Sequence, residues 1–216
     1  LPQAVFKWAA EHAGRLATQS GARNFHAMPV WLADGTTLRT PNTKALENYF
    51  GRSRNAARAS RSPLLRLVLL VCAGTGAVLQ LASGAYATSE QALFLQLLET
   101  IPARIVLVAD RGYASFLFFA LMHRRGAHLL TRLHAERFTK EPKRKLGDRD
   151  TLHDWARPAL SQSKFPELLE GCALTLEVRV IERQIVRKGY RTWTLRIVTT
   201  LTDPVLYPAD ELVELY

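Results

Sequence analysis

The sequence predicts an α/β protein, and two observations carry that prediction. Short apolar runs rich in β-branched residues, of which 104–109 (R-I-V-L-V-A) is the clearest, are too short for helices and suit buried strands. Stretches with apolar residues at helical spacing, such as 88–98 and 115–125, alternate with these runs. The order strand, hairpin, helix, strand, helix and strand is typical of a mixed α/β domain.

The composition fits a globular protein that binds a polyanion. With 216 residues, 48% of them hydrophobic and 22% charged, the chain suits one domain, or one domain with an insertion, and not wholesale disorder. Lys and Arg number 29 against 19 acidic residues, which gives a formal net charge of +10. Nucleic acid is the natural partner of such a surface, because neutralised phosphates release counterions. A soluble protein that happens to be basic remains the alternative.

Cysteine usage and hydropathy bear on the compartment. Cys72 and Cys172 lie far apart in apolar settings, which favours buried thiols in a reducing compartment over a disulfide. The apolar run 67–86 approaches membrane-spanning length, but three glycines interrupt it and Gln80 lies inside it. Two buried strands around a Gly-Thr-Gly turn explain this run better than a membrane helix.

The first quarter of the chain predicts a helix, a strand and a polar loop. Residues 1–19 carry apolar positions at helical spacing, and Gly21 ends the pattern. The segment 30–38 (V-W-L-A-D-G-T-T-L) predicts a strand with Asp34 in its middle. Residues 41–61 are polar and predict a loop with a short helical piece. This loop carries four arginines, Arg52, Arg54, Arg58 and Arg61.

The middle of the chain predicts most of the sheet and two helices. Gly and Pro residues punctuate it between apolar runs. The expected elements are a hairpin (65–73 and 77–82), a helix capped by Thr88 that stops before Pro102, a buried strand (104–109), a helix (115–125) ended by Gly126, and a strand (128–133).

The last third predicts a charged loop, a second hairpin and a helix. Residues 137–150 are strongly charged and interrupted by Pro and Gly, as in a solvated loop. Residues 174–184 and 191–200 alternate apolar and polar side chains, which predicts a half-exposed antiparallel hairpin. A helix opens at Pro208 and reaches only about two turns before Tyr216, a marginal length, so the chain is expected to be truncated.

Two aspartates are the candidates for chemistry. Asp34 lies within an apolar strand, and Asp110 ends the most apolar strand of the chain. A carboxylate in such a place is costly unless it is paired, hydrogen-bonded or bound to a metal. Two structural readings stay open: Asp34 with Gly35 as a turn dipeptide, and Asp110 as the cap of the next helix. The histidines show no zinc-ligand spacing.

The acid-bearing segments also resemble a known family. W-L-A-D-G-T-T-L, I-V-L-V-A-D-R-G-Y-A-S and A-D-E-L-V-E-L-Y occur in this order. G-A-H-L-L-T-R-L and G-D-R-D-T-L-H-D-W-A-R-P lie between the last two, the latter followed by E-V-R-V-I. Together these motifs resemble the DDE transposases of bacterial insertion sequences, in the IS-four branch. The likeness runs from about residue 30 to the end, and the ordered set is far more specific than D-R-G-Y alone.

The resemblance implies a fold and a metal site. The fold expected is RNase H-like, a mixed sheet with flanking helices and a β-rich insertion. Its expected parts are an N-terminal helical segment (1–21), the first part of the core (22–136), the insertion (137–205) and the start of the C-terminal core helix (206–216). Asp34 and Asp110 match the first two acids of the family, which are the catalytic ligands of two Mg2+ ions, with Mn2+ as a substitute.

One departure from the family concerns the third acid. The family carries it as the Glu of Y-x2-R-x3-E-x6-K, and only the opening Tyr is matched, by Tyr216. Glu211 and Glu214 precede that Tyr on the same helix, and neither is expected to replace the missing Glu. A solvated helix face is the simpler reading of both.

The function implied is DNA transposition through Mg2+-dependent phosphoryl transfer, with little or no activity in this chain alone. The implied partners are double-stranded DNA, as transposon ends and target, and a second copy in a homodimer on paired ends. The expected place is the bacterial cytoplasm, on the nucleoid when DNA is bound. The residues expected to contact DNA are Arg52, Arg54, Arg58, Arg111, Lys140, Lys143, Arg144 and Lys145.

Two other functions remain open at this point. The chain is alternatively a non-catalytic DNA-binding remnant or regulator derived from a transposase, which would bind DNA without metal. It is alternatively an RNase H-fold metal-dependent nuclease, which requires a third acid within the chain. Asp203, which follows the apolar strand I-V-T-T-L-T, is the candidate for that acid.

Overall fold

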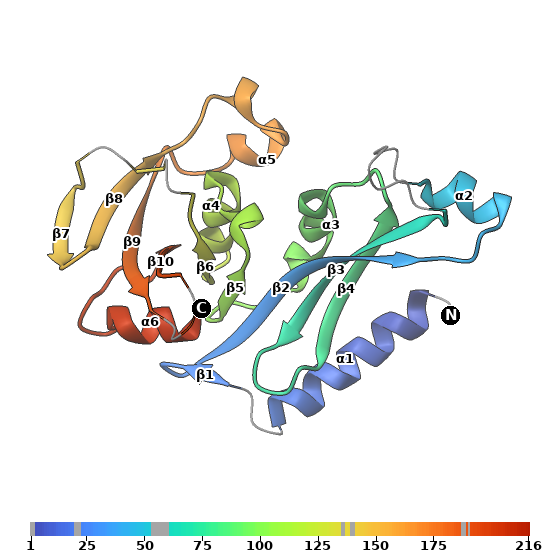
Figure 1. Ribbon diagram of the computed structural model, residues 1–216, viewed down its shortest axis with the longest axis horizontal. Coiled ribbons are helices and arrows are strands. Elements are labelled where there is room, and N and C mark those ends of the chain that lie inside the picture. The colour runs from blue at the N-terminus through green and yellow to red at the C-terminus, as the bar shows by residue number, and fades with distance from the viewer. Residues whose placement is uncertain are drawn as a thin grey trace. The chain divides into compact units, whose positions relative to one another are not determined.

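The chain folds as two compact units (Figure 1). The computed structural model describes residues 3–19, 23–52, 61–134, 137–138, 141–186, 189 and 191–216. The first unit comprises Leu1–Asn24 and Val30–Ile101, and the second comprises Phe25–Pro29 and Pro102–Tyr216. Each unit has its own strands, helices and buried side chains, and each is described by itself.

Three antiparallel strands form the sheet of the first unit. They are β2 (Met28–Arg39), β3 (Leu64–Cys72) and β4 (Val78–Ala85), in the order β4-β3-β2. The register places Asp34 opposite Leu69 and Gly35 opposite Val68. The hairpin predicted around the Gly-Thr-Gly turn is confirmed, and its strands account for the long apolar run. Among the described residues, no helix is long and apolar enough to cross a membrane.

Helices lie along this sheet. They are α1 (Gln3–Gln19), which packs along β4, α2 (Lys44–Phe50), and α3 (Glu90–Leu97), which packs on β3 and β4. The α3 side chains Leu93 and Phe94 are almost fully buried. The predicted cap of this helix is wrong by one residue: Ser89, not Thr88, accepts a hydrogen bond from the backbone N–H of Ala92 at 3.1 Å. Adjacent Ser and Thr are equally good cap residues by type, so only backbone geometry decides between them.

The second unit is a mixed sheet with helices. Its strand order is β5-β6-β10-β9-β8-β7, in which β5 and β6 are parallel and the other neighbours are antiparallel. The strands are β5 (Val106–Ala109), β6 (His128–Arg132), β7 (Arg144–Gly147), β8 (Asp150–Ala156), β9 (Thr175–Ile185) and β10 (Trp193–Thr199). The helices are α4 (Phe116–Arg124), α5 (Pro166–Glu170) and α6 (Ala209–Leu215), and a two-residue strand, β1 (Asn24–Phe25), precedes β2.

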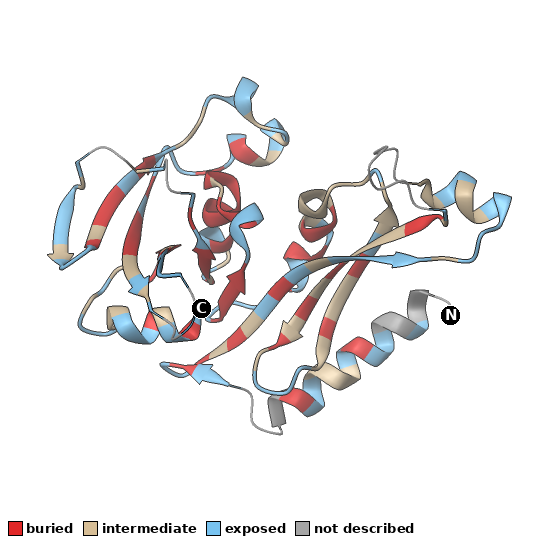
Figure 2. Ribbon diagram, viewed as in Figure 1, coloured by how far each residue is buried: buried red, intermediate tan, exposed pale blue. Residues whose placement is uncertain are grey.

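The core of the second unit is built on β5 and α4. All four residues of β5 are buried, and so are the first seven residues of α4, which packs on β6 and β9 (Figure 2). A strand that is apolar on both faces needs a cover on both faces, as the sequence predicted for 104–109. The α/β prediction, an RNase H-like order of strands and helices in a mixed sheet with a β-rich insertion, is confirmed.

The prediction for the charged segment 137–150 is wrong in part. Residues Arg144–Gly147 form the strand β7, which pairs with β8 and pairs with no other strand in the described chain. Charged side chains are compatible with such a strand, because an edge strand exposes much of its surface to water. Its pairing depends on β8, which the charge pattern of the segment does not reveal.

Candidate active site

Asp110 marks the carboxyl end of the fully buried strand β5. Its side chain is exposed, and its Oδ1 accepts a hydrogen bond from the backbone N–H of Gly112 at 2.7 Å. This bond caps the single 3-10 turn Arg111–Tyr113, and the following helix α4 has its own cap, Ser115. The strand therefore presents Asp110 at the sheet edge where ligand sites of α/β proteins gather.

The end of α6 lies beside Asp110. Leu212 and Leu215 bury one side of this short helix. Burial raises the pKa of the Tyr216 phenol, and the nearby Asp110 carboxylate raises it further because a second negative charge is disfavoured there. The charges of Arg132 and Arg111 and a hydrogen bond from the backbone of Arg132 act in the opposite direction. Asp110, Arg111, Arg132 and Tyr216 therefore share one electrostatic environment.

Two further side chains of this surface were not predicted from the sequence. The guanidinium of Arg132, at the end of β6, lies over the indole ring of Trp193 at 5.1 Å from its centroid. Both side chains are exposed, and Trp193 starts β10, far along the chain from Arg132. The sequence could have indicated Arg132, because it is a basic residue at the carboxyl end of the strand that follows β5. Neighbouring parallel strands end at the same sheet edge, so this residue is expected near Asp110.

Asp34 lies in the middle of β2 and its side chain is exposed. Its Oδ1 accepts a hydrogen bond from the backbone N–H of Gly35 at 2.8 Å. The reading of these two residues as a turn is wrong, because both pair with β3. Gly35 gives room to the α3 side chain Glu90, whose Cδ would lie 2.4 Å from a Cβ added at position 35.

The two aspartates have the donor chemistry that Mg2+ requires. Each carboxylate is exposed and accepts a hydrogen bond from a nearby backbone N–H at Oδ1, and carboxylate oxygens are the ligands that hard divalent cations prefer. Among the described residues, no three His, Cys, Asp or Glu side chains form a group that could hold a metal ion. The donor chemistry of Asp34 in the first unit, and separately that of Asp110 in the second, thus suits a ligand of a hard divalent cation.

The basic residues predicted to contact DNA have different surroundings. Arg52 pairs with Glu47 and donates to Asn42. The ammonium of Lys143 lies 2.8 Å from Glu177 and 2.9 Å from Asp154, and hydrogen bonds to these two carboxylates raise its pKa. The exposed residues Arg111, Arg144 and Lys145 have no recorded acidic partner among the described residues, and Arg54, Arg58 and Lys140 lie outside the described residues.

Comparison with known proteins gives one family. Residues 26–216 match the family model described as a transposase DDE domain. Over 184 residues, 85% of this chain and 40% of the relative, the chain is 26% identical to the transposase InsG for insertion sequence element IS4 of Escherichia coli K12. Over 106 residues, 49% of this chain and 36% of the relative, it is 26% identical to "Putative transposase InsZ" of the same organism.

The chain matches less than half the length of either relative. A cryo-EM structure of a piggyBac transposase synaptic complex with hairpin DNA aligns with 81% of this chain and 33% of its own chain, at a TM-score of 0.45 and 6% identity.

Asp203, the candidate for a third acid within the chain, organises a turn. Its Oδ1 accepts hydrogen bonds from the backbone N–H groups of Val205 and Leu206, at 2.8 and 3.0 Å. These bonds, the Leu206 bond first, hold the pKa of the carboxyl below its ordinary value. This geometry is that of an Asx turn, which accounts for the Asp without a metal.

We expect Asp203→Ala to destabilise the protein in a pH-dependent way. Because the folded-state pKa is lowered, the carboxylate contributes stability above its ordinary pKa of 3.8 and loses that contribution as the pH falls through the folded pKa. Urea unfolding at a series of pH values should show a difference from the wild type that is full at neutral pH and shrinks in acid. A difference that stays constant down to the acid end would contradict the turn role.

Proposed function

Because this chain belongs to the transposase DDE domain family, we propose that Asp34 and Asp110 are two of the three metal-binding carboxylates of a site that cuts and joins DNA. The observation that carries the proposal is the position of Asp110. It is an exposed carboxylate at the end of a wholly buried strand, with three functional side chains, Arg111, Arg132 and Tyr216, in its electrostatic environment.

The reaction proposed is displacement at a DNA phosphodiester. Asp34 and Asp110 would hold part of a site for two Mg2+ ions, and the bound ions would supply activation of the attacking hydroxyl and stabilisation of the leaving oxygen of the phosphate. The chain's own part is to hold the oxygen donors still: the Gly112 N–H fixes Asp110, and the Gly35 N–H fixes Asp34. Arg111 and Arg132 bring positive charge to the same edge, where they can bind a phosphate of the strand.

The three-carboxylate group is not complete among the described residues. With two of three ligands, affinity for the metal is low and the developing charge is poorly stabilised. The proposal is therefore that this chain alone binds metal weakly and cuts DNA poorly or not at all. We further propose that the protein acts as a homodimer on paired transposon ends in a bacterial cell. We also propose that residues 137–205 form an insertion in the catalytic core.

The metal role of Asp110 can be tested without activity. We expect Mn2+ added to the isotope-labelled chain to broaden the amide resonances of Gly112 and Ala114 by paramagnetic relaxation. Asp110→Asn should abolish this broadening, because it removes one negative charge from the site. The matched control is Asp154→Asn, which changes an exposed acid of β8 and should leave the broadening at Gly112 unchanged.

The same substitution bears on catalysis in any active transposase that carries this domain. Asp110→Asn or Asp34→Asn should lower the rate of Mg2+-dependent cleavage of end DNA by at least about 100-fold, with DNA affinity nearly unchanged. Cleavage that survives both substitutions would refute the assignment. Mg2+-dependent nicking by the present chain, lost in Asp110→Ala, would refute the proposal that the chain is inactive.

The contribution of Arg144 and Lys145 on β7 to DNA binding can be measured against that of Lys143, whose charge is already paired with two acids. We expect the double variant Arg144→Ala/Lys145→Ala to weaken DNA binding and to reduce the slope of log affinity against log salt by about 1.8, since each phosphate contact adds about 0.9. Lys143→Ala is the control, and its effect should be smaller because Asp154 and Glu177 already neutralise that ammonium. Equal effects of the two variants, or binding independent of salt, would contradict this placement of DNA.

A further inference from the structure

A fully buried ion pair lies in the second unit between β8 and β9. Arg179 has no exposed surface, and its Nε and Nη2 donate to the two carboxylate oxygens of Asp150 at 2.8 and 2.5 Å. Asp150 lies opposite Ile181 in the β8–β9 register, so it shares a face of the sheet with Arg179. Such a bidentate pair fixes the orientation of the guanidinium plane.

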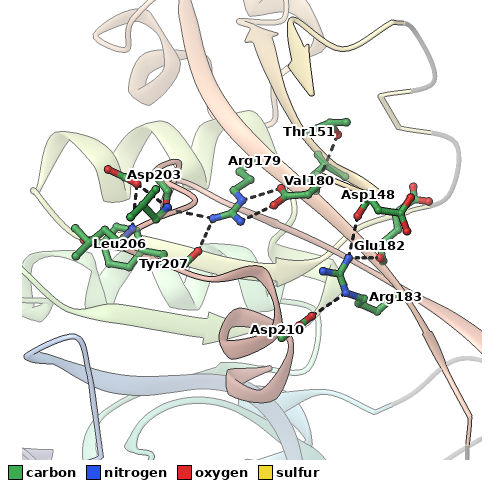
Figure 3. Close-up of polar contacts among 12 residues, drawn as sticks. Asp148, Thr151, Arg179, Val180, Glu182, Arg183, Asp203, Leu206, Tyr207 and Asp210 are labelled. Carbon is green, nitrogen blue, oxygen red and sulfur yellow. Dashed lines mark hydrogen bonds and ion pairs between the residues drawn. The ribbon is translucent and has the colours of Figure 1, made fainter. Parts of the chain in front are cut away.

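The third nitrogen of Arg179 extends the pair to the chain that precedes α6. Its Nη1 donates to the backbone carbonyl of Tyr207 at 2.6 Å and, more weakly, to that of Asp203 at 3.4 Å (Figure 3). The Asp203 carboxylate organises the same turn from its other side through Val205 and Leu206. The turn is thus held by one buried cation and by its own first residue.

A second arginine of β9 holds the first turn of α6. Arg183 lies four residues after Arg179, on the same face of the strand. Its Nε lies 2.9 Å from the Asp210 carboxylate, and its Nη1 donates to the carbonyl of Asp148 at 3.2 Å (Figure 3). Arg179 and Arg183 therefore bind the turn before α6 and the start of α6 to one rigid strand.

We propose that Arg179 is a positioning residue of the candidate active site: by fixing the Asp203–Tyr207 turn it sets where α6 ends, and so places Tyr216 beside Asp110. The role in catalysis rests on the proposed function, whereas the placement itself does not. The connection is short, since α6 begins two residues after Tyr207 and ends one residue before Tyr216. A small shift of a catalytic group is costly to a reaction that depends on orientation.

The geometry calls for an arginine and not for any cation. The guanidinium carries donors on three nitrogens in a fixed plane, and here two of them bind Asp150 while the third binds the turn. A lysine ammonium at this place can pair with Asp150, but its single nitrogen cannot also reach the Tyr207 carbonyl in the same geometry. The Arg179→Lys variant is therefore expected to keep the ion pair with Asp150 and to lose the hydrogen bond to the Tyr207 carbonyl.

The test is hydrogen exchange of the chain without DNA or metal. We expect Arg179→Lys to increase amide exchange in α6 by about 10-fold or more while exchange in β8, β9 and β10 changes by less than about 2-fold. Uniform loss of protection across the second unit would mean a merely structural role and would overturn the proposal, as would unchanged exchange in α6.

The matched control is Arg196→Lys. Arg196 also pairs with an acid, Glu182, and also donates to backbone carbonyls, among them those of Arg137 and Phe138, which lie outside the turn and α6. Exchange in α6 should be unchanged in this variant. If Arg179→Lys does not fold, Asp203→Ala, which alters the same turn from its exposed side, should still raise exchange selectively in α6, and an absence of that effect would overturn the proposal.

In an active transposase that carries this domain, Arg179→Lys should lower the rate constant of DNA cleavage at saturating DNA while leaving DNA affinity within about 2-fold. Rapid exchange of α6 together with unchanged cleavage would separate the two ideas: the placement of α6 by Arg179 would stand, and the assignment of the Asp110 edge as the catalytic site would fall. A loss of DNA affinity alone would overturn the positioning role in catalysis.

Discussion

A guanidinium with no exposed surface stays in a protein interior only when its charge is balanced and its N–H groups are bonded. Arg179 meets both conditions, through the two oxygens of Asp150 and through the carbonyl of Tyr207. Removing the Asp150 carboxylate would leave an uncompensated buried charge, which is far more costly than the pair is stabilising. Because the partners lie on β8 and on the turn before α6, this one residue binds the β-rich part of the second unit to the helix that reaches the Asp110 edge.

The Asp110 edge combines a rigid base with a charged surface. The rigid base is β5, which is buried along its whole length, and α4, which packs on the neighbouring strand β6. The surface consists of one carboxylate, two guanidinium groups and the Tyr216 phenol, whose pKa is raised by burial and by the carboxylate. Asp34, the candidate site residue of the first unit, lies in the middle of β2, and the backbone N–H of Gly35 donates a hydrogen bond to its carboxylate.

The sequence was sufficient for the elements that depend on local apolar patterns. The β3–β4 hairpin, the buried strand β5 and the helix ended by Gly126 were predicted because their patterns are unambiguous, and Gly126 has the positive φ of 69° expected at a helix end. The strand β7 was not predicted, since nothing in a charged segment reveals its partner β8. The sequence could not decide between Thr88 and Ser89 as the N-cap of α3, because both residue types cap helices and only the backbone geometry selects Ser89.

The two aspartates of the candidate site could be predicted from the sequence, but the contacts around them could not. Asp34 and Asp110 follow from strand positions and from the family resemblance, both of which are properties of short segments. The partners of Arg179 lie 24 to 29 residues away along the chain, and Arg132 meets Trp193 across the sheet. Such contacts depend on strand register, and an alternating pattern gives the face of a residue without giving its neighbour.

The most direct measurement of the central claim is the titration of the Tyr216 phenol by NMR in the wild type and in Asp110→Asn. If the end of α6 lies beside the Asp110 carboxylate, the wild-type phenol titrates above its ordinary pKa, and neutralising Asp110 lowers that pKa, because the phenolate no longer meets a second negative charge. Asp154→Asn should leave the titration unchanged. A Tyr216 pKa that is the same in the wild type and in Asp110→Asn would contradict the account.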